Sequence, residues 1–297
     1  MNAPQPLAQV LGHPAVPRPC WHAQLHLRVG ARGEATVPLE RSHRGPLRLL
    51  RGYRHQPTRG GCDCWEQIVV HPPGGIAAGD SLSIAASAAT GSHLLLTAPG
   101  AAKWYRGHGA QPARQLLRLE VQAGAHLEWL PMETIVYDGA QALIENHWHV
   151  ASGASLIAAE LVCLGRPAGD QPFRRGRLRQ STRLVIDGAP AFIERAVLDG
   201  GDAHWRGPAG LGRASAFGTL LIVPARPGQI EPMLERVRAE VAGAPGEVGA
   251  SALPRLLIVR WRGERAEHGW QALRGAWRAV RADVNGHEPV PPRIWSC

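Results

Sequence analysis

The stretches Gly124-Ala-His-Leu127 and Gly153-Ala-Ser-Leu156 each place a turn glycine directly before an apolar run in the middle of the chain. The same device occurs at Gly79-Asp-Ser-Leu82 and Gly91-Ser-His-Leu94. Because glycine accepts the backbone conformations of tight turns, four copies predict stacked strands. Their uneven spacings of 12, 33 and 29 residues favour a layered or β-helix-like stack with unequal turns over a strict solenoid repeat. Chance recurrence in a glycine-rich chain is the alternative.

The C-terminal third predicts a small helical portion after a mainly β fold. The chain of 297 residues contains 35 Gly and 25 Pro, which restrict longer helices to places where these residues are scarce. Two such places, near residues 229–242 and 267–284, carry apolar residues at helical spacing. These are Ile230, Met233, Leu234, Val237 and Val241 in the first run, and Trp270, Leu273, Trp277, Val280 and Val284 in the second.

Strand patterns and a proline-rich start define the expected organisation. Apolar and polar residues alternate from Trp21 to Val29, as in a half-buried strand. Residues 81–102 contain no Asp, Glu, Lys or Arg, but polar residues interrupt them too often for a bilayer span, so we expect strand, turn and strand. Residues 1–19 contain five prolines and predict a flexible tail. We expect residues 20–297 to form one domain because no long linker divides them.

Charge and cysteine content restrict the cellular setting. A net charge of +9 and a pI near 10.3 imply attraction to an acidic partner, whether nucleic acid, membrane surface or protein. Lys103 is the sole lysine, and so marked a preference for arginine is also the mark of a GC-rich genome. Five cysteines form no regular framework and the N-terminus lacks a signal-peptide pattern, so we expect a reduced, cytoplasmic location.

The common catalytic motifs are absent from the sequence. No lysine follows a glycine-rich stretch as a Walker A loop requires, and Gly210-Leu-Gly212 continues without completing a dinucleotide-binding turn. The Gly-x-Ser-x-Gly and His-Glu-x-x-His motifs are also missing. These absences favour a binding protein over an enzyme, although a diffuse catalytic site is not excluded by motifs alone.

Two short pairs of metal-binding side chains stand out. Cys62 and Cys64, like His147 and His149, are two residues apart, so in an extended segment each pair points to one face. Neither has the second pair that completes a structural zinc site. Buried thiols and surface imidazoles are the alternative interpretation.

Two carboxylates lie in apolar surroundings. Glu160 interrupts Leu156-Ile-Ala-Ala-Glu-Leu-Val162, which otherwise resembles a core strand, and Asp80 follows a glycine-rich run. A buried carboxylate must be paired, hydrated or lining a polar passage. For Glu160 the competing interpretation is an ion pair with an arginine such as Arg166. For Asp80 it is an ordinary turn residue.

A cationic and aromatic cluster follows the turn at residues 97–102. Lys103, Trp104, Tyr105 and Arg106 are consecutive, and we expect them to bind an acidic partner, with Trp104 stacking on Arg106. Nucleic acid is an alternative ligand for this cluster. No RRM, KH or helix-turn-helix pattern supports it, so we expect no nucleic-acid binding.

Three segments in order resemble the UreD family of urease accessory proteins. The first is His71-Pro-Pro-Gly-Gly-Ile76 with Gly79-Asp80, and the second is Thr97-Ala-Pro-Gly-Ala-Ala-Lys-Trp-Tyr-Arg106. The third is Leu127-Glu-Trp-Leu-Pro-Met-Glu-Thr-Ile-Val-Tyr-Asp-Gly-Ala140. Two departures, Met132 and Tyr137, change neither charge nor backbone requirements, and the resemblance spans nearly the whole folded chain.

The resemblance implies a stacked β scaffold without catalytic activity that helps to activate urease in the cytoplasm. It implies binding to UreF, through UreF to the GTPase UreG, and directly to apo-urease. It also implies an internal passage for nickel, held transiently rather than as a resident cofactor. We expect His71, Asp80 and Glu160 to line that passage, with Cys62, Cys64, His147 and His149 as weaker candidates. A metal-dependent β-fold enzyme is the alternative function.

Overall fold

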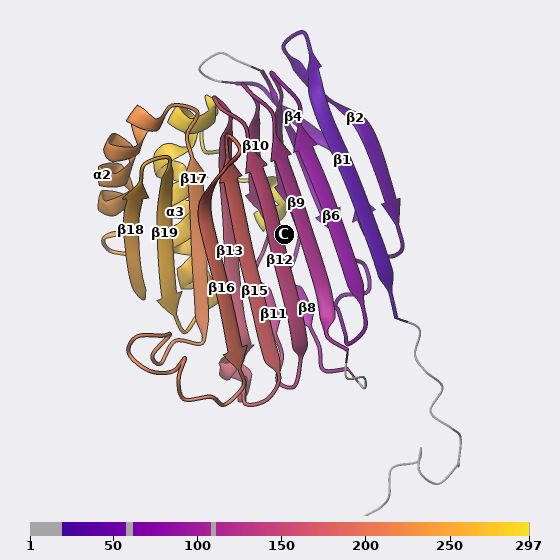
Figure 1. Ribbon diagram of the computed structural model, residues 1–297, viewed down its shortest axis with the longest axis vertical. Helices are drawn as coiled ribbons and strands as arrows, with labels where there is room; N and C mark the ends of the chain where they lie inside the picture. The colour runs from indigo at the N-terminus through magenta and orange to yellow at the C-terminus, as the bar shows by residue number, and fades with distance from the viewer. Residues whose placement is uncertain (1–19, 58–61, 108–110, 297) are drawn as a thin grey trace, which may run out of the picture.

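Two β-sheets form the main body of the protein, seen in a computed structural model that describes residues 20–57, 62–107 and 111–296 (Figure 1). The first sheet has 7 strands in the order β16-β15-β12-β9-β6-β1-β2. The second has 12 strands, with the path β18-β19-β17-β13-β10-β7-β5-β3 and with β4, β8, β11 and β14 paired beside it. The strands of the first sheet are β1 (His22–Arg32), β2 (Ala35–Arg44), β6 (Ser81–Ala88), β9 (Ala113–Val121), β12 (Gln141–Val150), β15 (Arg177–Ile186) and β16 (Ala189–Asp199). Those of the second are β3 (Arg48–Leu49), β4 (Tyr53–His55), β5 (Cys64–Val70), β7 (His93–Thr97), β8 (Ala102–Trp104), β10 (His126–Leu130), β11 (Thr134–Val136), β13 (Ser155–Arg166), β14 (Gln171–Pro172), β17 (Ala216–Val223), β18 (Glu247–Leu253) and β19 (Leu256–Gly263).

The chain alternates between the sheets, from β5 through β6, β7, β9, β10, β12 and β13 to β15. Within each sheet these strands pair in parallel, as β6 with β9 and β7 with β10 do, so each pass through both sheets adds one coil. Antiparallel strands β2 and β16 close the ends of the first sheet. The predicted mainly β, stacked, β-helix-like fold is therefore confirmed.

The four glycine devices mark strand starts in this stack. Gly79, Gly91, Gly124 and Gly153 all have positive φ angles, from +68° to +87°, and each is followed two residues later by a strand. In the second sheet the leucines of three copies are neighbours in register: Leu94, Leu127 and Leu156. The 33- and 29-residue spacings are thus full coils, whereas the 12-residue spacing crosses from one sheet to the other. Chance recurrence is excluded by this register.

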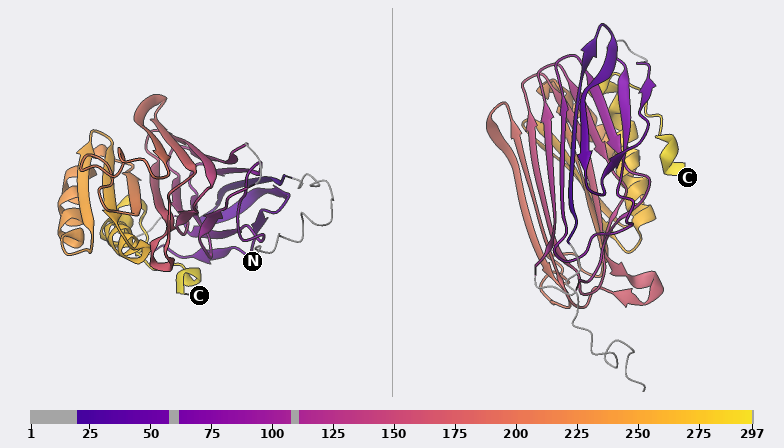
Figure 2. Two further views of the ribbon diagram at one scale, coloured as in Figure 1. Left: turned by 90° about the horizontal axis from the view of Figure 1, so that it is seen from below. Right: turned by 90° about the vertical axis from the view of Figure 1, so that its right-hand side faces the viewer.

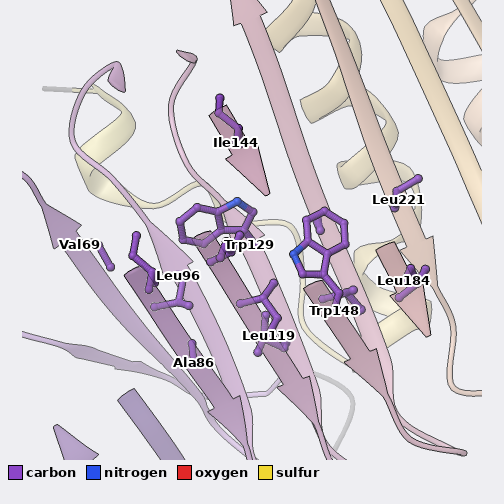
Figure 3. Packing of buried hydrophobic residues seen from close by; sticks show 14 of the residues in the cluster. Val69, Ala86, Leu96, Leu119, Trp129, Ile144, Trp148, Leu184 and Leu221 are labelled. Carbon is purple, nitrogen blue, oxygen red and sulfur yellow. The ribbon is translucent and has the colours of Figure 1, made fainter. Parts of the chain in front are cut away.

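The main hydrophobic core lies between the sheets. Figure 3 shows Leu119 and Trp148 of the first sheet packed near Leu96 and Trp129 of the second. Alternate residues of each strand point into this layer because successive side chains of a strand face opposite sides. Each large side chain buried here contributes roughly 1.5–3 kcal/mol of transfer free energy.

Two helices cover one side of the stack (Figure 2). These are α2 (Ile230–Val241) and α3 (Ala266–Asn285), which confirm the helices expected near residues 229–242 and 267–284. Their apolar stripes form a second core against the second sheet, and Trp277 is 1% exposed there. Gly286 ends α3 with a φ of 78°.

Short 3₁₀ turns occur at Pro167–Gly169, Pro227–Gln229 and Arg293–Ser296. The tail predicted at residues 1–19 lies outside the described residues, and the single domain stays a prediction.

A buried ion pair fastens α3 to the second sheet. Glu128 and Arg281 are 0% and 4% exposed in their side chains, with Arg281 Nη2 donating to Glu128 Oε1 at 2.9 Å. Trp277 Nε1 donates to Oε2 at 2.7 Å. Burial alone would raise the pKa of the Glu128 carboxyl, but Arg281 and the hydrogen bond from His93 outweigh it and hold that pKa well below its usual range.

Removing one partner of this pair will cost more stability than removing both charges. We expect Arg281→Met to lower the free energy of unfolding by about 3–5 kcal/mol, because Glu128 is left charged and buried. In Glu128→Gln/Arg281→Met no charge is left alone, so the double variant will regain most of that loss. Urea unfolding measures the free energy of unfolding of Arg281→Met, of Glu128→Gln and of the double variant. A loss in the double variant equal to the sum of the two single losses would contradict the buried-charge explanation.

Candidate functional site

A cavity of about 380 Å³ lies between the two sheets. Gln115 of β9 and Gln180 of β15 reach it from the first sheet, and Trp129 of β10 and Glu160 of β13 from the second. His71, at the end of β5, also lines it. Most of the remaining lining is apolar, so these few polar groups determine what the cavity can bind.

Glu160 holds its position through neutral groups of the opposite sheet. Its Oε1 accepts from Asn146 Nδ2 at 2.7 Å, and its Oε2 accepts from Gln180 Nε2 at 3.0 Å and more weakly from Thr182 Oγ1 at 3.4 Å. Protein surrounds the carboxyl, and its accessible surface faces the cavity. Burial raises its pKa to about 7, against the lowering effect of these three hydrogen bonds.

The competing interpretation, an ion pair between Glu160 and Arg166, is not what the described residues form. Arg166 is exposed at the far end of β13, and no ion pair to Glu160 forms within the part of the chain that the structure describes. Position 160 faces inward between the sheets, whereas Arg166 lies where the strand reaches solvent. Among the described residues the Glu160 carboxylate therefore has no ion-pair partner, and the cation that shares its cavity lining is Lys103.

His71 offers a second donor in the same cavity. Its Nε2 is buried without a hydrogen-bond partner among the described residues. Burial lowers the pKa of the imidazole, more than the charge of Asp80 raises it, so the ring is neutral near pH 7. A neutral imidazole has one nitrogen lone pair, which makes it a ligand for borderline metal ions.

Asp80 does not join Glu160 in the cavity lining. Its Oδ2 accepts from the Ala77 backbone at 2.8 Å, and its Oδ1 accepts from the Trp21 backbone at 2.8 Å. These bonds hold the turn before β6 and the start of β1 together. The turn interpretation therefore describes this residue in the structure, and a role for Asp80 in a nickel passage stays a prediction.

The two metal-binding pairs have different surroundings. His147 and His149 lie on the outer face of β12, away from the core, where His147 is half-buried and His149 is exposed. Cys62 is half-buried, whereas Cys64 is fully buried at the start of β5. Within the described residues, Cys64 lies in a group with His93 and Glu128, whose potential ligand atoms are all within 4.8 Å of one another.

Sequence reasoning missed the two residues that accompany Cys64. A signal was present, because His93 and His126 occupy the same third position in two of the glycine devices. In-register stacking places such positions side by side. Glu128, two residues beyond His126, then falls on the same strand face.

The expected partner-binding cluster is divided between two faces. Trp104 is 1% exposed in the main core, so the prediction that it stacks on Arg106 or contacts a partner is wrong. Successive side chains of a strand face opposite sides, so four consecutive residues cannot all lie on one surface. Lys103 is half-buried at the cavity, while Tyr105 is exposed and stacks on Tyr137 with ring centroids 4.7 Å apart.

A basic surface surrounds this tyrosine stack. Arg106, Arg174 and Arg175 are exposed there, and Arg175 Nη2 pairs with Asp138 at 2.8 Å. Asp138 and Asp170 also line this surface, so its three guanidinium groups leave an excess of one positive charge. We call Tyr105, Arg106, Tyr137, Arg174 and Arg175 the tyrosine–arginine surface.

Comparison with known proteins identifies the family of this chain. The family model described as "UreD urease accessory protein" matches residues 22–296. The chain belongs to the UreD family of urease accessory proteins. A urease accessory protein UreD of Dechloromonas aromatica (strain RCB) is 42% identical over 279 residues, which cover 94% of this chain and 95% of that protein. One of Pseudomonas aeruginosa (strain PAO1) is 41% identical over 280 residues, covering 94% and 96%.

UreD membership confirms the family resemblance read from the three sequence segments, all of which lie inside the matched range. Across the described part of the chain, no helix combines the length and the apolar content that crossing a bilayer requires. The cavity and the tyrosine–arginine surface are therefore features of a UreD chain, and their roles are considered below.

Replacing Glu160 by glutamine will change the pH dependence of stability. The folded state keeps the Glu160 proton up to a pKa of about 7, whereas the unfolded state loses it near 4.5, so this group destabilises the fold as pH rises between those values. Glu160→Gln cannot ionise. We expect its stability relative to wild type to increase by about 3 kcal/mol between pH 4.5 and pH 8. Urea unfolding at both pH values checks this, and parallel curves for the two proteins would show that the carboxyl is not desolvated.

Proposed function

We propose that this chain is a non-catalytic factor of urease maturation in the cytoplasm, which carries nickel transiently through the cavity between its sheets. We further propose that it binds apo-urease directly and UreF, and through UreF the GTPase UreG. Membership of the UreD family supports the general role. The unpaired inward-facing carboxylate of Glu160 carries the nickel proposal.

The donor set suits passage of an ion rather than its retention. A carboxylate oxygen from Glu160 and an imidazole nitrogen from His71 are ligand types that nickel accepts, and neither is a thiolate. A proton also competes with the ion, because the pKa of Glu160 is about 7. Nickel is therefore released when the pH falls or when a site with more ligands is offered. In the proposed pathway that site belongs to urease.

A metal-dependent enzyme is the main competing function. Such an enzyme would hold a metal tightly and in stoichiometric amount, as catalytic sites with three protein ligands do. Among the described residues the cavity lining offers one carboxylate and one imidazole as ligands, and its other polar side chains include the amides of Gln115 and Gln180 and the ammonium of Lys103. Metal analysis of purified protein separates the two functions, because a transient carrier loses its nickel to a weak chelator and an enzyme does not.

Removal of the cavity carboxylate will slow urease activation without loss of partner binding. We expect Glu160→Gln and His71→Gln each to reduce nickel-dependent urease activity in co-expressing cells by roughly 10-fold, because one of two donors is lost. Glu145→Gln is the matched control. It makes the same chemical change on β12, at a position on the outer face of the first sheet.

Pull-down of urease subunits and UreF with the same variants separates passage from assembly. All variants should recover wild-type amounts of both partners, since neither position 160 nor position 71 lies on the exposed surface of the protein. Full activation by soluble Glu160→Gln and His71→Gln would reject the nickel passage while leaving the scaffold role intact. Failure of the wild-type chain to recover either partner would reject the scaffold role itself.

The tyrosine–arginine surface is the proposed contact for an acidic partner. We expect Arg106→Glu/Arg174→Glu to lower recovery of UreF or urease by at least about fivefold, because like charges then oppose each other across the interface. Arg114→Glu/Arg118→Glu, on the exposed outer face of β9, makes the same change in net charge and is the control. Equal recovery with both variants would place the partner contact elsewhere.

A further inference from the structure

A row of metal-binding side chains crosses the second sheet on the face that packs against α3. Cys64, His93, His126 and Ser155 are the first residues of β5, β7, β10 and β13, and each pairs in register with the next. Parallel neighbours are about 4.8 Å apart, so in-register side chains on one face are close enough to share an ion. The cavity between the sheets is lined by none of these residues.

The row is covered by the last turns of α3 and by the residues that follow it. Cys64, His93 and Glu128 are each 0% exposed, and a ligand atom of each lies within 4.8 Å of the others. Glu128 is engaged by Arg281 and Trp277, so it is not free to be a main ligand. His287, just past the end of α3, has its ring centroid 4.7 Å from that of His93, edge to face.

The hydrogen bonds of His93 leave one of its nitrogens available. Its Nε2 lies 2.9 Å from Glu128 Oε1 and 3.5 Å from Asn285 Nδ2, the latter at the outer limit of a hydrogen bond. Glu128 is ionised and accepts only, so Nε2 carries the hydrogen and Nδ1 carries the lone pair. That Nδ1 is buried and has no partner among the described residues.

His287 is oriented in the same manner. Its Nε2 donates to the backbone oxygen of Cys62 at 3.1 Å, which leaves the lone pair on Nδ1. Imidazoles that bind metals in proteins commonly donate their other N–H to a carboxylate or to a backbone carbonyl. Here His93 has the carboxylate and His287 has the carbonyl, so both rings have the outer hydrogen bonds of metal ligands.

We propose that Cys64, His93 and His287 form a binding site for one borderline divalent cation of the Co²⁺, Ni²⁺ and Zn²⁺ class. The ligand atoms of Cys64 and His93 lie within 4.8 Å of each other, and rotation of the His287 ring, whose centroid is 4.7 Å from that of His93, brings its Nδ1 in as the third ligand. The result is a thiolate and nitrogen set that such ions prefer. Binding displaces the thiol proton to solvent, so the ion and the Cys64 thiolate together add one positive charge. The C-terminal end of α3, with its partial negative charge, lies beside that charge.

This site is distinct from the proposed nickel passage, and its test is independent of urease. The full chain is incubated with Co²⁺, in a Cys20→Ser/Cys297→Ser background that removes one exposed thiol and the thiol of the last residue, and its absorption is recorded. We expect one equivalent of Co²⁺ with a near-ultraviolet thiolate-to-cobalt band. Cys64→Ala should remove the band and weaken binding by about 10-fold or more. Cys163→Ser, which removes a partly buried thiol elsewhere in the sheet, should leave the band unchanged.

A second variant and a second control keep the test decisive. His93→Gln should weaken Co²⁺ binding by about 10-fold as well, and it serves if circular dichroism shows that Cys64→Ala is unfolded. Glu145→Gln, on the outer face of the first sheet, should bind Co²⁺ as wild type does. A band that persists in folded Cys64→Ala, that disappears in Cys62→Ser or Cys163→Ser instead, or that is absent from the wild-type chain would overturn the proposal.

Discussion

In-register pairing of parallel strands is the constraint on which the rest of this molecule depends. Each coil passes once through each sheet, so a given position of one coil lies beside the same position of the next. Leu94, Leu127 and Leu156 form an apolar row for this reason, and they stabilise the space between the sheets. The same register also arranges polar residues in rows. Polar residues that recur at one position of successive coils therefore form a site that several strands share.

Polar groups inside such a stack are costly unless they have partners, and two carboxylates here have partners of different kinds. Glu160 lies between the sheets and is held by neutral amides and a hydroxyl. Glu128 lies on the other side of the second sheet and is neutralised by Arg281. The difference in partners explains the difference in behaviour. Glu128 stays charged and structural, whereas burial raises the pKa of Glu160 to about 7.

The sequence predicted those features that depend on local periodicity. The strand alternation, the turn glycines and the helical spacing from Trp270 to Val284 are each visible within a short window. The partners of Glu160 were not predictable, because Asn146 and Gln180 approach it only when two sheets face each other. The error at Trp104 had a local cause. Strand alternation requires adjacent side chains to face opposite sides, and the cluster from Lys103 to Arg106 was expected to act as one surface.

Location of the bound nickel tests the central claim most directly. Anomalous diffraction at the nickel absorption edge, from crystals of this chain or its UreF complex soaked in Ni²⁺, would show where the ion lies. The account predicts a peak of partial occupancy between the sheets, next to the Glu160 carboxyl and the His71 ring. Peaks confined to the outer surface, such as at His147 and His149, with an empty cavity at saturating nickel would contradict it.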